Sequence, residues 1–359
     1  MSRSILIMAG GTGGHIFPGL AVADILRSQG WLVTWLGVPN SMEAELVPKR
    51  GYQMAWVSFS GVRGKGLLRK LLLPFNLLVA LWQSAAAILR HRPDVVLGMG
   101  GYITFPGGLM AALLRRPLAI HEQNSIAGLS NKVLARLAQK VLSGFPGVLP
   151  HTIWCGNPVR VDIAALPDPQ QRLAARKGVL NVLVLGGSLG AKAINETVPQ
   201  ALALLQKDVH FNVVHQTGKQ YLEAVKNAYQ QAGIQADIKP FIDEMAKQYG
   251  NADLVICRAG ALTVAELAAA GVASILIPFP FAVDDHQTHN ARFLSERHAA
   301  LLLPQSELST ENLAQVLRNL MEGERGREKL LAMAVQARSV AKAGAALKVA
   351  EICGALADL

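Results

Sequence analysis

Short β-branched runs alternate with helix-length stretches along the whole 359-residue chain. Such runs, bounded by glycine-rich and proline-rich segments, predict strands, and the stretches between them fit helices. Strands that alternate with helices indicate parallel sheets with right-handed crossovers. The twelve predicted strands are Ile5–Met8, Leu32–Leu36, Met54–Val57, Asp94–Gly98, Leu118–His121, Lys140–Ser143, Asn181–Leu185, Phe211–His215, Ala236–Lys239, Leu254–Cys257, Ser274–Ile277 and Ala300–Leu303.

The two halves of the chain repeat one design. A glycine loop follows the first strand of each series, at Gly10–Gly14 and again 176 residues later at Gly186–Gly190. We therefore expect an α/β fold of two Rossmann-like, doubly wound parallel-sheet domains that face a cleft, with ligands beyond the carboxyl ends of the strands. The domains are predicted at residues 1–160 and 161–340, and a last helix within 341–359, about Ala345–Ala357, fits either of them.

Composition suits this architecture: 51% of residues are hydrophobic, and only 6% are aromatic. Three distant cysteines offer neither a disulfide framework nor a C-x-x-C metal site, as in a protein of the reducing cytoplasm. The first apolar run is too short for a signal peptide, and we expect no stretch with the roughly 18 to 20 apolar residues of a membrane span.

The positive charge is concentrated in the first half. Residues 1–160 hold 16 Lys and Arg against 5 Asp and Glu, whereas the remainder holds 19 against 20. This asymmetry predicts an anionic partner for the first domain, either nucleic acid, phosphates or a membrane surface. A merely solvated basic surface is the alternative.

The glycines of Gly10–Gly14 predict a backbone loop that approaches an anion, next to a helix beginning near Pro18. The G-x-G-x-x-G fingerprint fails because Ile16 stands at its last position, and the P-loop fails at Leu20. A tight strand-to-helix turn without ligand is the alternative. Further glycine loops at predicted strand ends favour several phosphates; these are Gly98–Gly101, soon followed by Gly107–Gly108, and Gly186–Gly190.

Two segments of the second half carry further candidate chemistry. Thr263 and Glu266 have the spacing of a capping box, but Glu266 is equally suited to accept hydrogen bonds from ribose hydroxyls. His286 and His289 are weak evidence for a metal, and no D-x-D motif is present.

Eight motifs in this order resemble the GT-B glycosyltransferases that add N-acetylglucosamine (GlcNAc) during bacterial peptidoglycan synthesis. The resemblance spans residues 8 to about 290. The motifs are GGTGGH (Gly10–His15), SGVRGKG (Ser60–Gly66), GMGGY (Gly98–Tyr102), HEQN (His121–Asn124), GNPVR (Gly156–Arg160), GGSLGA (Gly186–Ala191), CRAGALTVAE (Cys257–Glu266) and DDHQ (Asp284–Gln287).

The resemblance implies an inverting transfer of GlcNAc from UDP-GlcNAc to the C4 hydroxyl of the muramoyl sugar of lipid I, an undecaprenyl-diphosphate-linked acceptor, to give lipid II. It implies no metal, no cofactor and no nucleic acid, and it leaves room for other cell-wall enzymes as partners. The implied location is peripheral, on the cytoplasmic face of the plasma (inner) membrane. Positions that match substrate contacts are Thr12, Gly13, Gly14, Asn124, Arg160, Ser188, Ile242, Ala261, Leu262, Thr263, Val264, Ala265, Glu266 and Gln287.

A single displacement of this kind needs a general base for the acceptor hydroxyl and charge stabilisation for the departing UDP. His15 is the predicted base, since the pKa of an ordinary imidazole is near 6.5. A histidine that only orients a phosphate or caps the helix is the alternative. Arg160, Ser188 and the loop Gly186–Ala191 are predicted to stabilise the diphosphate.

An apolar stretch with basic residues at its start, 67–82, is the predicted membrane contact. Arg69, Lys70, Pro74 and Asn76 argue against a span, so we expect an interfacial helix; a core helix is the alternative. The expected contact residues are Arg69, Lys70, Leu71, Leu72, Phe75, Leu78, Val79 and Trp82.

Three other functions fit parts of the sequence. A UDP-GlcNAc epimerase or hydrolase would not need the apolar basic stretch, and a UDP-sugar-binding regulator or scaffold would tolerate loss of His15. A nucleic-acid-binding function would explain the positive charge but not the glycine loops. The basic half also lacks a recognisable recognition helix or aromatic stacking motif.

Overall fold

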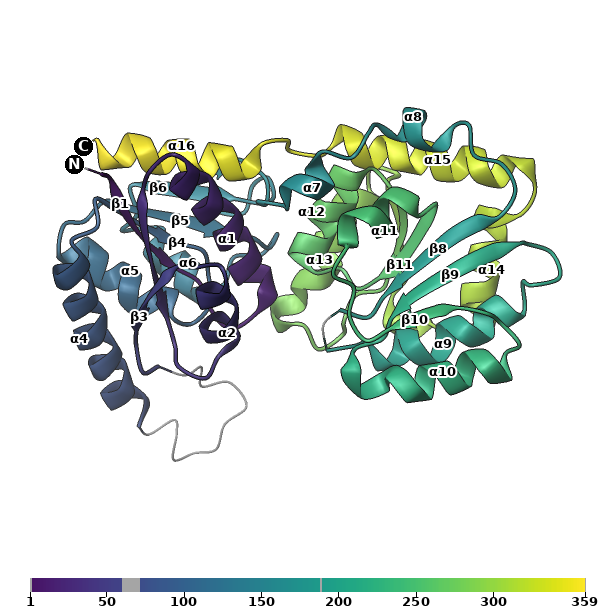
Figure 1. Cartoon of the computed structure of the whole chain (residues 1–359), viewed down its shortest axis with the longest axis horizontal. Helices are drawn as coiled ribbons and strands as arrows, with labels where there is room; N and C mark the ends of the chain where they lie inside the picture. The colour runs from purple at the N-terminus through teal and green to yellow at the C-terminus, as the bar shows by residue number, and fades with distance from the viewer. Residues whose placement is uncertain (1, 60–71, 188, 359) are drawn as a thin grey trace. The chain divides into compact units, whose positions relative to one another are not determined.

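The computed structural model describes residues 2–59, 72–187 and 189–358, without the side chain of residue 324. The chain divides into two compact units (Figure 1). Unit 1 comprises Met1–Arg160 and Lys342–Leu359, and unit 2 comprises Val161–Ala341.

In the described part of unit 1, seven parallel strands form one sheet in the order β3-β2-β1-β4-β5-β6-β7. The strands are β1 (Ser4–Met8), β2 (Leu32–Gly37), β3 (Gln53–Trp56), β4 (Val95–Gly98), β5 (Leu118–Glu122), β6 (Lys140–Ser143) and β7 (Ile153–Trp154). The helices are α1 (Gly13–Ser28), α2 (Met42–Lys49), α4 (Leu73–His91), α5 (Thr104–Leu113), α6 (Leu129–Leu134) and α16 (Ala345–Ala357).

In the described part of unit 2, six parallel strands follow the order β10-β9-β8-β11-β12-β13. The strands are β8 (Leu180–Leu185), β9 (Phe211–Gln216), β10 (Asp237–Lys239), β11 (Leu254–Cys257), β12 (Ala273–Leu276) and β13 (Ala300–Leu302). The helices are α7 (Val161–Ala164), α8 (Pro169–Leu173), α9 (Lys192–Ala203), α10 (Leu222–Gln231), α11 (Met245–Asn251), α12 (Ala261–Ala270), α13 (His286–Ser295), α14 (Thr310–Met321) and α15 (Glu324–Ser339).

The predicted pair of doubly wound parallel sheets is confirmed. Each of the twelve predicted strands is present, with ends within one residue of those expected. β7 was not predicted, because a two-residue edge strand is too short to show a pattern of its own.

Alternation along β1 shows how the sheet of unit 1 is covered on both faces. Ile5 and Ile7 join the buried cluster that includes α1 and α16, and Leu6 and Met8 join the cluster that includes α4 and α5. All four side chains are at most 1% exposed. Burial on both faces explains why the strand reads as a continuous apolar run.

The last helix, α16, completes unit 1. Its apolar face packs against α1 and the sheet, and Val349, Cys353 and Leu356 are buried there. Arg3, which precedes β1, forms an ion pair with Asp358 at the end of the chain. The sequence left open which domain this helix joins, and the structure places it on the first.

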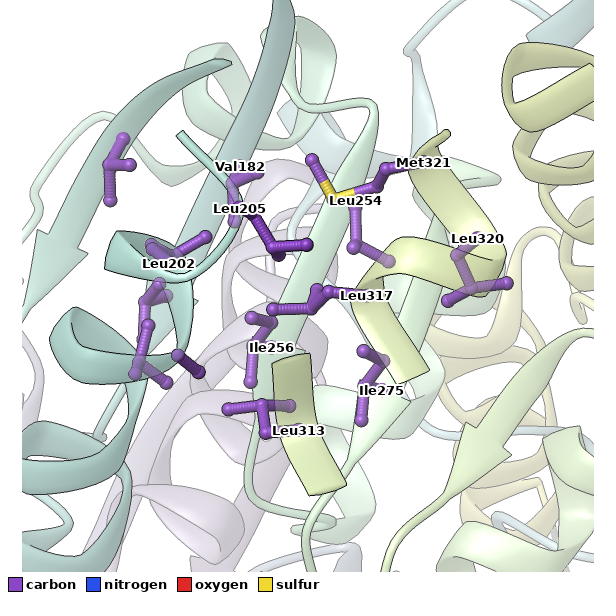
Figure 2. Close-up of a cluster of buried hydrophobic side chains, with 14 of the residues drawn as sticks. Val182, Leu202, Leu205, Leu254, Ile256, Ile275, Leu313, Leu317, Leu320 and Met321 are labelled. Carbon is purple, nitrogen blue, oxygen red and sulfur yellow. The ribbon is translucent and has the colours of Figure 1, made fainter. Parts of the chain in front are cut away.

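The core of unit 2 lies between its sheet and the helices α9 and α14 (Figure 2). Leu254 and Ile256 of β11 face Leu313 and Leu317 of α14 in this cluster. The core fixes the central strands, whose carboxyl ends carry the loops considered next.

Helix α1 begins at Gly13, so the prediction of a helix beginning near Pro18 is wrong. Pro18 lies inside the helix, where it removes one amide donor from the backbone ladder. The carbonyl that loses this bond is that of Gly14. The earlier start brings His15 into the first helical turn.

Candidate active site

The strand order of unit 1 reverses between β1 and β4, and the loops that follow these strands lie side by side. A Cβ atom built on Gly101 would lie only 2.3 Å from the carbonyl oxygen of Gly10. Gly101 also has a φ of +88°, which L side chains rarely adopt. Close backbone packing at the switch point therefore accounts for part of the glycine content.

The glycine loop Gly10–Gly14 is hydrogen-bonded to the buried carboxylate of Glu43. The amide of Gly11 donates to Oε2 of Glu43, which is fully buried, and the amide of Val38 donates to Oε1. The amide of Gly11 therefore faces a carboxylate of the chain itself and is not free for the anion of a ligand. The amide of His15 is the first of α1 to find a backbone partner, the carbonyl of Thr12, and no side chain caps the helix.

His15 is half-buried, and its Nδ1 atom lies 2.9 Å from Oε1 of Gln123. The Nε2 atom of Gln123 lies 3.1 Å from Nδ1 of His121, whose Nε2 lies 2.9 Å from the carbonyl oxygen of Gly156. Burial of His121 lowers its pKa to about 4. The candidate base is thus the exposed end of a buried hydrogen-bonded chain.

Asn124 is positioned by another buried carboxylate. Its amide and its side-chain nitrogen both donate to Oε1 of Glu122, at 3.0 and 3.3 Å. The other oxygen accepts from Gly128 and Asn131. Glu122 is 3% exposed, so this carboxylate orders the loop after β5 from inside the protein.

In unit 1 the structure brings together Gly13, Gly14, His15 and Asn124 at the carboxyl ends of β1 and β5. Thr12 is exposed at the N-cap of α1, and Arg160 is exposed at the last position of the first segment of unit 1.

The second switch point lies between β8 and β11 of unit 2. A Cβ atom on Gly190 would lie 2.2 Å from the carbonyl oxygen of Thr217, so the glycine loop packs tightly on the loop after β9. Ile242 is 4% exposed, and its amide donates to Oε1 of Gln216. A ligand contact of Ile242 would therefore use its carbonyl group. Ser188 lies outside the described residues.

The capping-box alternative for Thr263 and Glu266 is wrong, because the N-cap of α12 is Gly260. Glu266 instead lies in the second turn of α12, half-buried, where Oε2 accepts a hydrogen bond from the hydroxyl of Tyr249. Ala261 and Val264 have buried side chains, so only their backbone groups can meet a ligand. Leu262, Thr263 and Ala265 are partly exposed.

Gln287 of α13 joins the loops after β11 and β12. Its Oε1 atom accepts hydrogen bonds from the amides of Ala259 and Phe279, at 3.3 and 2.9 Å. Its Nε2 atom has no partner among the described residues and can donate to a ligand.

The Nδ1 atom of His286 donates to the carbonyl oxygen of Val283 at 2.6 Å, and His289 lies one turn further along α13. Among the described residues, no group of three or more His, Cys, Asp or Glu side chains is placed to hold a metal ion.

Helix α4 presents a broad apolar face to solvent. Phe75, Leu78 and Trp82 are 66%, 65% and 71% exposed, Leu72 just before the helix is exposed, and Val79 is half-buried. Within the described chain it is the one helix long and apolar enough to cross a membrane by length and composition, and 22% of its apolar window is buried. From the sequence we expected no stretch long and apolar enough for a membrane span, and by length and composition α4 is an exception. Arg69, Lys70 and Leu71 lie outside the described residues.

Sequence reasoning missed the buried polar residues behind the site, Glu43, Glu122 and Gln123. Glu122 and Gln123 stand in the HEQN motif, where polar residues directly after a buried strand were a usable signal. Glu43 lies in a polar helix start and carried no such signal.

Two family models match the chain: the N-terminal domain of glycosyltransferase family 28 over residues 5–143, and its C-terminal domain over residues 181–348. A protein of Aromatoleum aromaticum is 59% identical over 355 residues, which are 99% of this chain and 98% of that protein. The chain belongs to glycosyltransferase family 28.

Further members of family 28 agree with this placement. A protein of Azoarcus is 60% identical over 99% of both chains, and both relatives are named UDP-N-acetylglucosamine–N-acetylmuramyl-(pentapeptide) pyrophosphoryl-undecaprenol N-acetylglucosamine transferase. The crystal structure of Acinetobacter baumannii MurG is 42% identical, covers 98% of this chain and 99% of its own, and has a TM-score of 0.86. Family 28 membership confirms that the chain is a glycosyltransferase with the GT-B fold.

Proposed function

We propose that this chain transfers GlcNAc from UDP-GlcNAc to the C4 hydroxyl of the muramoyl sugar of lipid I, which gives lipid II for peptidoglycan synthesis. The observation that carries the proposal is full-length identity of 59% and 60% with two proteins named for this transfer. No comparable observation favours an epimerase, a hydrolase or a non-enzymatic regulator.

The loops of unit 2 suit a nucleotide diphosphate-sugar. Helices α9 and α12 begin with residues whose side chains form no cap, so their first amides can receive a diphosphate. Glu266 and Gln287 can accept from and donate to the hydroxyls and base of the donor. The first amides of α9 and α12, together with Arg160 and Ser188, are proposed to stabilise the charge of the departing diphosphate without a metal.

Unit 1 is proposed to bind the acceptor. The acceptor hydroxyl attacks the anomeric carbon as the bond to UDP breaks, and the hydroxyl proton passes to His15. The amides of Gly13 and Gly14 are proposed to face the acceptor diphosphate, while Asn124 lies beside the sugar.

We further propose that α4 lies on an anionic membrane surface where the lipid-linked acceptor is found. Its exposed apolar side chains and the excess of 16 basic over 5 acidic residues in residues 1–160 support an interfacial position.

The test combines purified protein, labelled UDP-GlcNAc and a lipid I analogue, with and without a chelator. We expect a disaccharide-linked lipid product in equal amounts under both conditions. Release of free GlcNAc or an epimer without lipid product would refute the proposed transfer. Loss of product on chelation alone would refute only its metal independence.

A further inference from the structure

The hydrogen bonds behind His15 have a defined direction, because they end on a group that can only accept. The carbonyl oxygen of Gly156 lies 2.9 Å from Nε2 of His121, so this nitrogen carries a hydrogen. His121 is fully buried, and burial lowers its pKa to about 4, so the ring is neutral near pH 7. A neutral imidazole has one N–H, which leaves Nδ1 of His121 as an acceptor.

The acceptors on His121 fix the orientation of the Gln123 side-chain amide, and this orientation determines which atom faces His15. Its Nε2 atom donates to Nδ1 of His121 at 3.1 Å and also faces the carbonyl oxygen of His121 at 3.3 Å. The reversed amide would place an oxygen lone pair against each of these acceptors. The Oε1 atom of Gln123 therefore faces His15 and accepts from its Nδ1–H at 2.9 Å.

The contact has no room for an alternative arrangement. Gln123 is 1% exposed, and its backbone carbonyl accepts from Asn157 at 3.0 Å. A Cβ atom on Gly100 would lie 2.6 Å from Nδ1 of His15 and 3.0 Å from Oε1 of Gln123. The glycine after β4 thus leaves just enough space for the two side chains to meet.

We propose that Gln123 and His121 are positioning residues that hold neutral His15 in its Nδ1–H form, so that the lone pair of Nε2 receives the proton of the acceptor hydroxyl. This inference rests on the proposed function for its role in transfer, but the tautomer is a property of the free protein. The Nε2 atom of His15 has no hydrogen-bond partner among the described residues, so it is available to a substrate. Which of the two ring nitrogens of a histidine carries the hydrogen is set by the hydrogen bond that the other ring nitrogen makes.

The test is a long-range ¹H–¹⁵N spectrum of the full chain with ¹⁵N-labelled histidine, recorded above pH 8 without substrates. His15 and His121 signals are assigned among the nine histidines by single substitution. We expect opposite tautomers: protonated Nδ1 in His15, and protonated Nε2 in His121. A protonated Nε2 in His15 of the unaltered protein would overturn the proposal, whatever the behaviour of any variant.

Gln123→Met removes the side-chain hydrogen bonds to His15 and His121 at similar volume, whereas Gln123→Glu keeps an oxygen that accepts from His15. The matched control is Gln139→Met, since Gln139 bonds to Leu118 at the other end of the same strand, at 2.7 Å. We expect the Nδ1–H form of His15 in Gln123→Glu and Gln139→Met, and its loss in Gln123→Met. Turnover in Gln123→Met should fall about 10-fold, the effect of one hydrogen bond, with the KM for UDP-GlcNAc unchanged.

The outcomes separate the two proposals. Retention of the Nδ1–H form in Gln123→Met, or its loss with unchanged turnover, would contradict the positioning role. Failure of the unaltered protein to transfer GlcNAc would refute the proposed function, while the spectrum would still report the tautomer.

Discussion

The Oε2 atom of Glu43 lies 3.1 Å from the backbone nitrogen of Gly11, so a buried acidic side chain orders the loop proposed to receive an anion. In Glu43→Ala, the amides of Gly11 and Val38 lose their acceptor and a cavity forms in place of the buried side chain. We expect the free energy of unfolding to fall by about 2–4 kcal/mol, measured by urea denaturation.

Glu45→Ala is the matched control, because Glu45 lies on the same helix and is exposed, and its ion-pair partner among the described residues is exposed Lys49. We expect a change within about 0.5 kcal/mol for this variant. Equal stability of the Glu43 and Glu45 variants would show that the buried carboxylate does not order the loop.

His15→Ala should lower turnover by about two to four orders of magnitude, since a general base contributes this much. The KM for UDP-GlcNAc should change little, because His15 lies in unit 1 and the donor is assigned to unit 2. Steady-state rates with labelled donor test this. A near-normal turnover would remove His15 from the role of base.

Arg172 connects the ends of two helices in unit 2. Its guanidinium donates to the carbonyls of Tyr249 and Gly250 in the last turn of α11, both at 3.0 Å, and to those of Ala270 and Gly271 at the end of α12. A lysine ammonium group cannot replace two guanidinium nitrogens that each donate to two carbonyls. Arg172→Lys should therefore lower the free energy of unfolding by about 2–4 kcal/mol.

For comparison, Arg318→Lys alters a weak pair on the surface and should change stability by at most about 0.5 kcal/mol. Both variants are compared by urea denaturation of the full chain. Similar midpoints in the two would contradict the role assigned to Arg172.

Acid should weaken unit 2 through His215. Burial lowers the pKa of this side chain to about 3, whereas an imidazole in the unfolded chain titrates near 6.5. Between these values the unfolded chain binds more protons, so stability falls as the pH falls. We expect a loss of about 2 kcal/mol between pH 8 and pH 5 from this group.

The measurement is urea unfolding at both pH values, followed by deuterium labelling of peptides from β9. His215→Gln removes the titration and can still bond to Tyr229 or Asn195, the present partners of the ring. An equal pH dependence in the unaltered protein and this variant would assign the acid sensitivity to other groups.

Removal of two large side chains from α4 should release the protein from membranes. In Phe75→Ser combined with Trp82→Ser, we expect at least about a 10-fold loss of retention on anionic vesicles, because burial of one such side chain contributes about 1.5–3 kcal/mol. Sedimentation with vesicles at low salt measures this. Leu204→Ser, which alters an exposed leucine of unit 2, should have no effect. Equal retention of all three proteins would contradict the proposed membrane contact.

Strand positions were predictable because parallel strands covered on both faces must be apolar throughout, as Leu254–Cys257 shows. The start of α1 was not, because a helix that opens on two glycines and contains Pro18 lacks the usual signals. A two-residue edge strand such as Ile153–Trp154 has no period to detect.

The glycine loops and His15 were identifiable from the residues themselves, since few other roles require four glycines beside a histidine. The groups behind them were not. Glu43 is 32 residues from Gly11, and Gln123 is 108 residues from His15. Only the order of strands in the sheet brings such pairs together, and no local pattern reports it.

The return of α16 to unit 1 bears on how the chain is made. A ribosome releases the strands of this unit first and the whole of unit 2 next, and the helix that covers Ile5 and Ile7 emerges only after unit 2. A nascent chain therefore carries an open apolar surface until α16 has been made, a state prone to association. A message truncated at the start of α16 would still encode the whole of unit 2, yet unit 1 would lack this cover. The final helix thereby makes correct folding of the first domain depend on complete translation of the second.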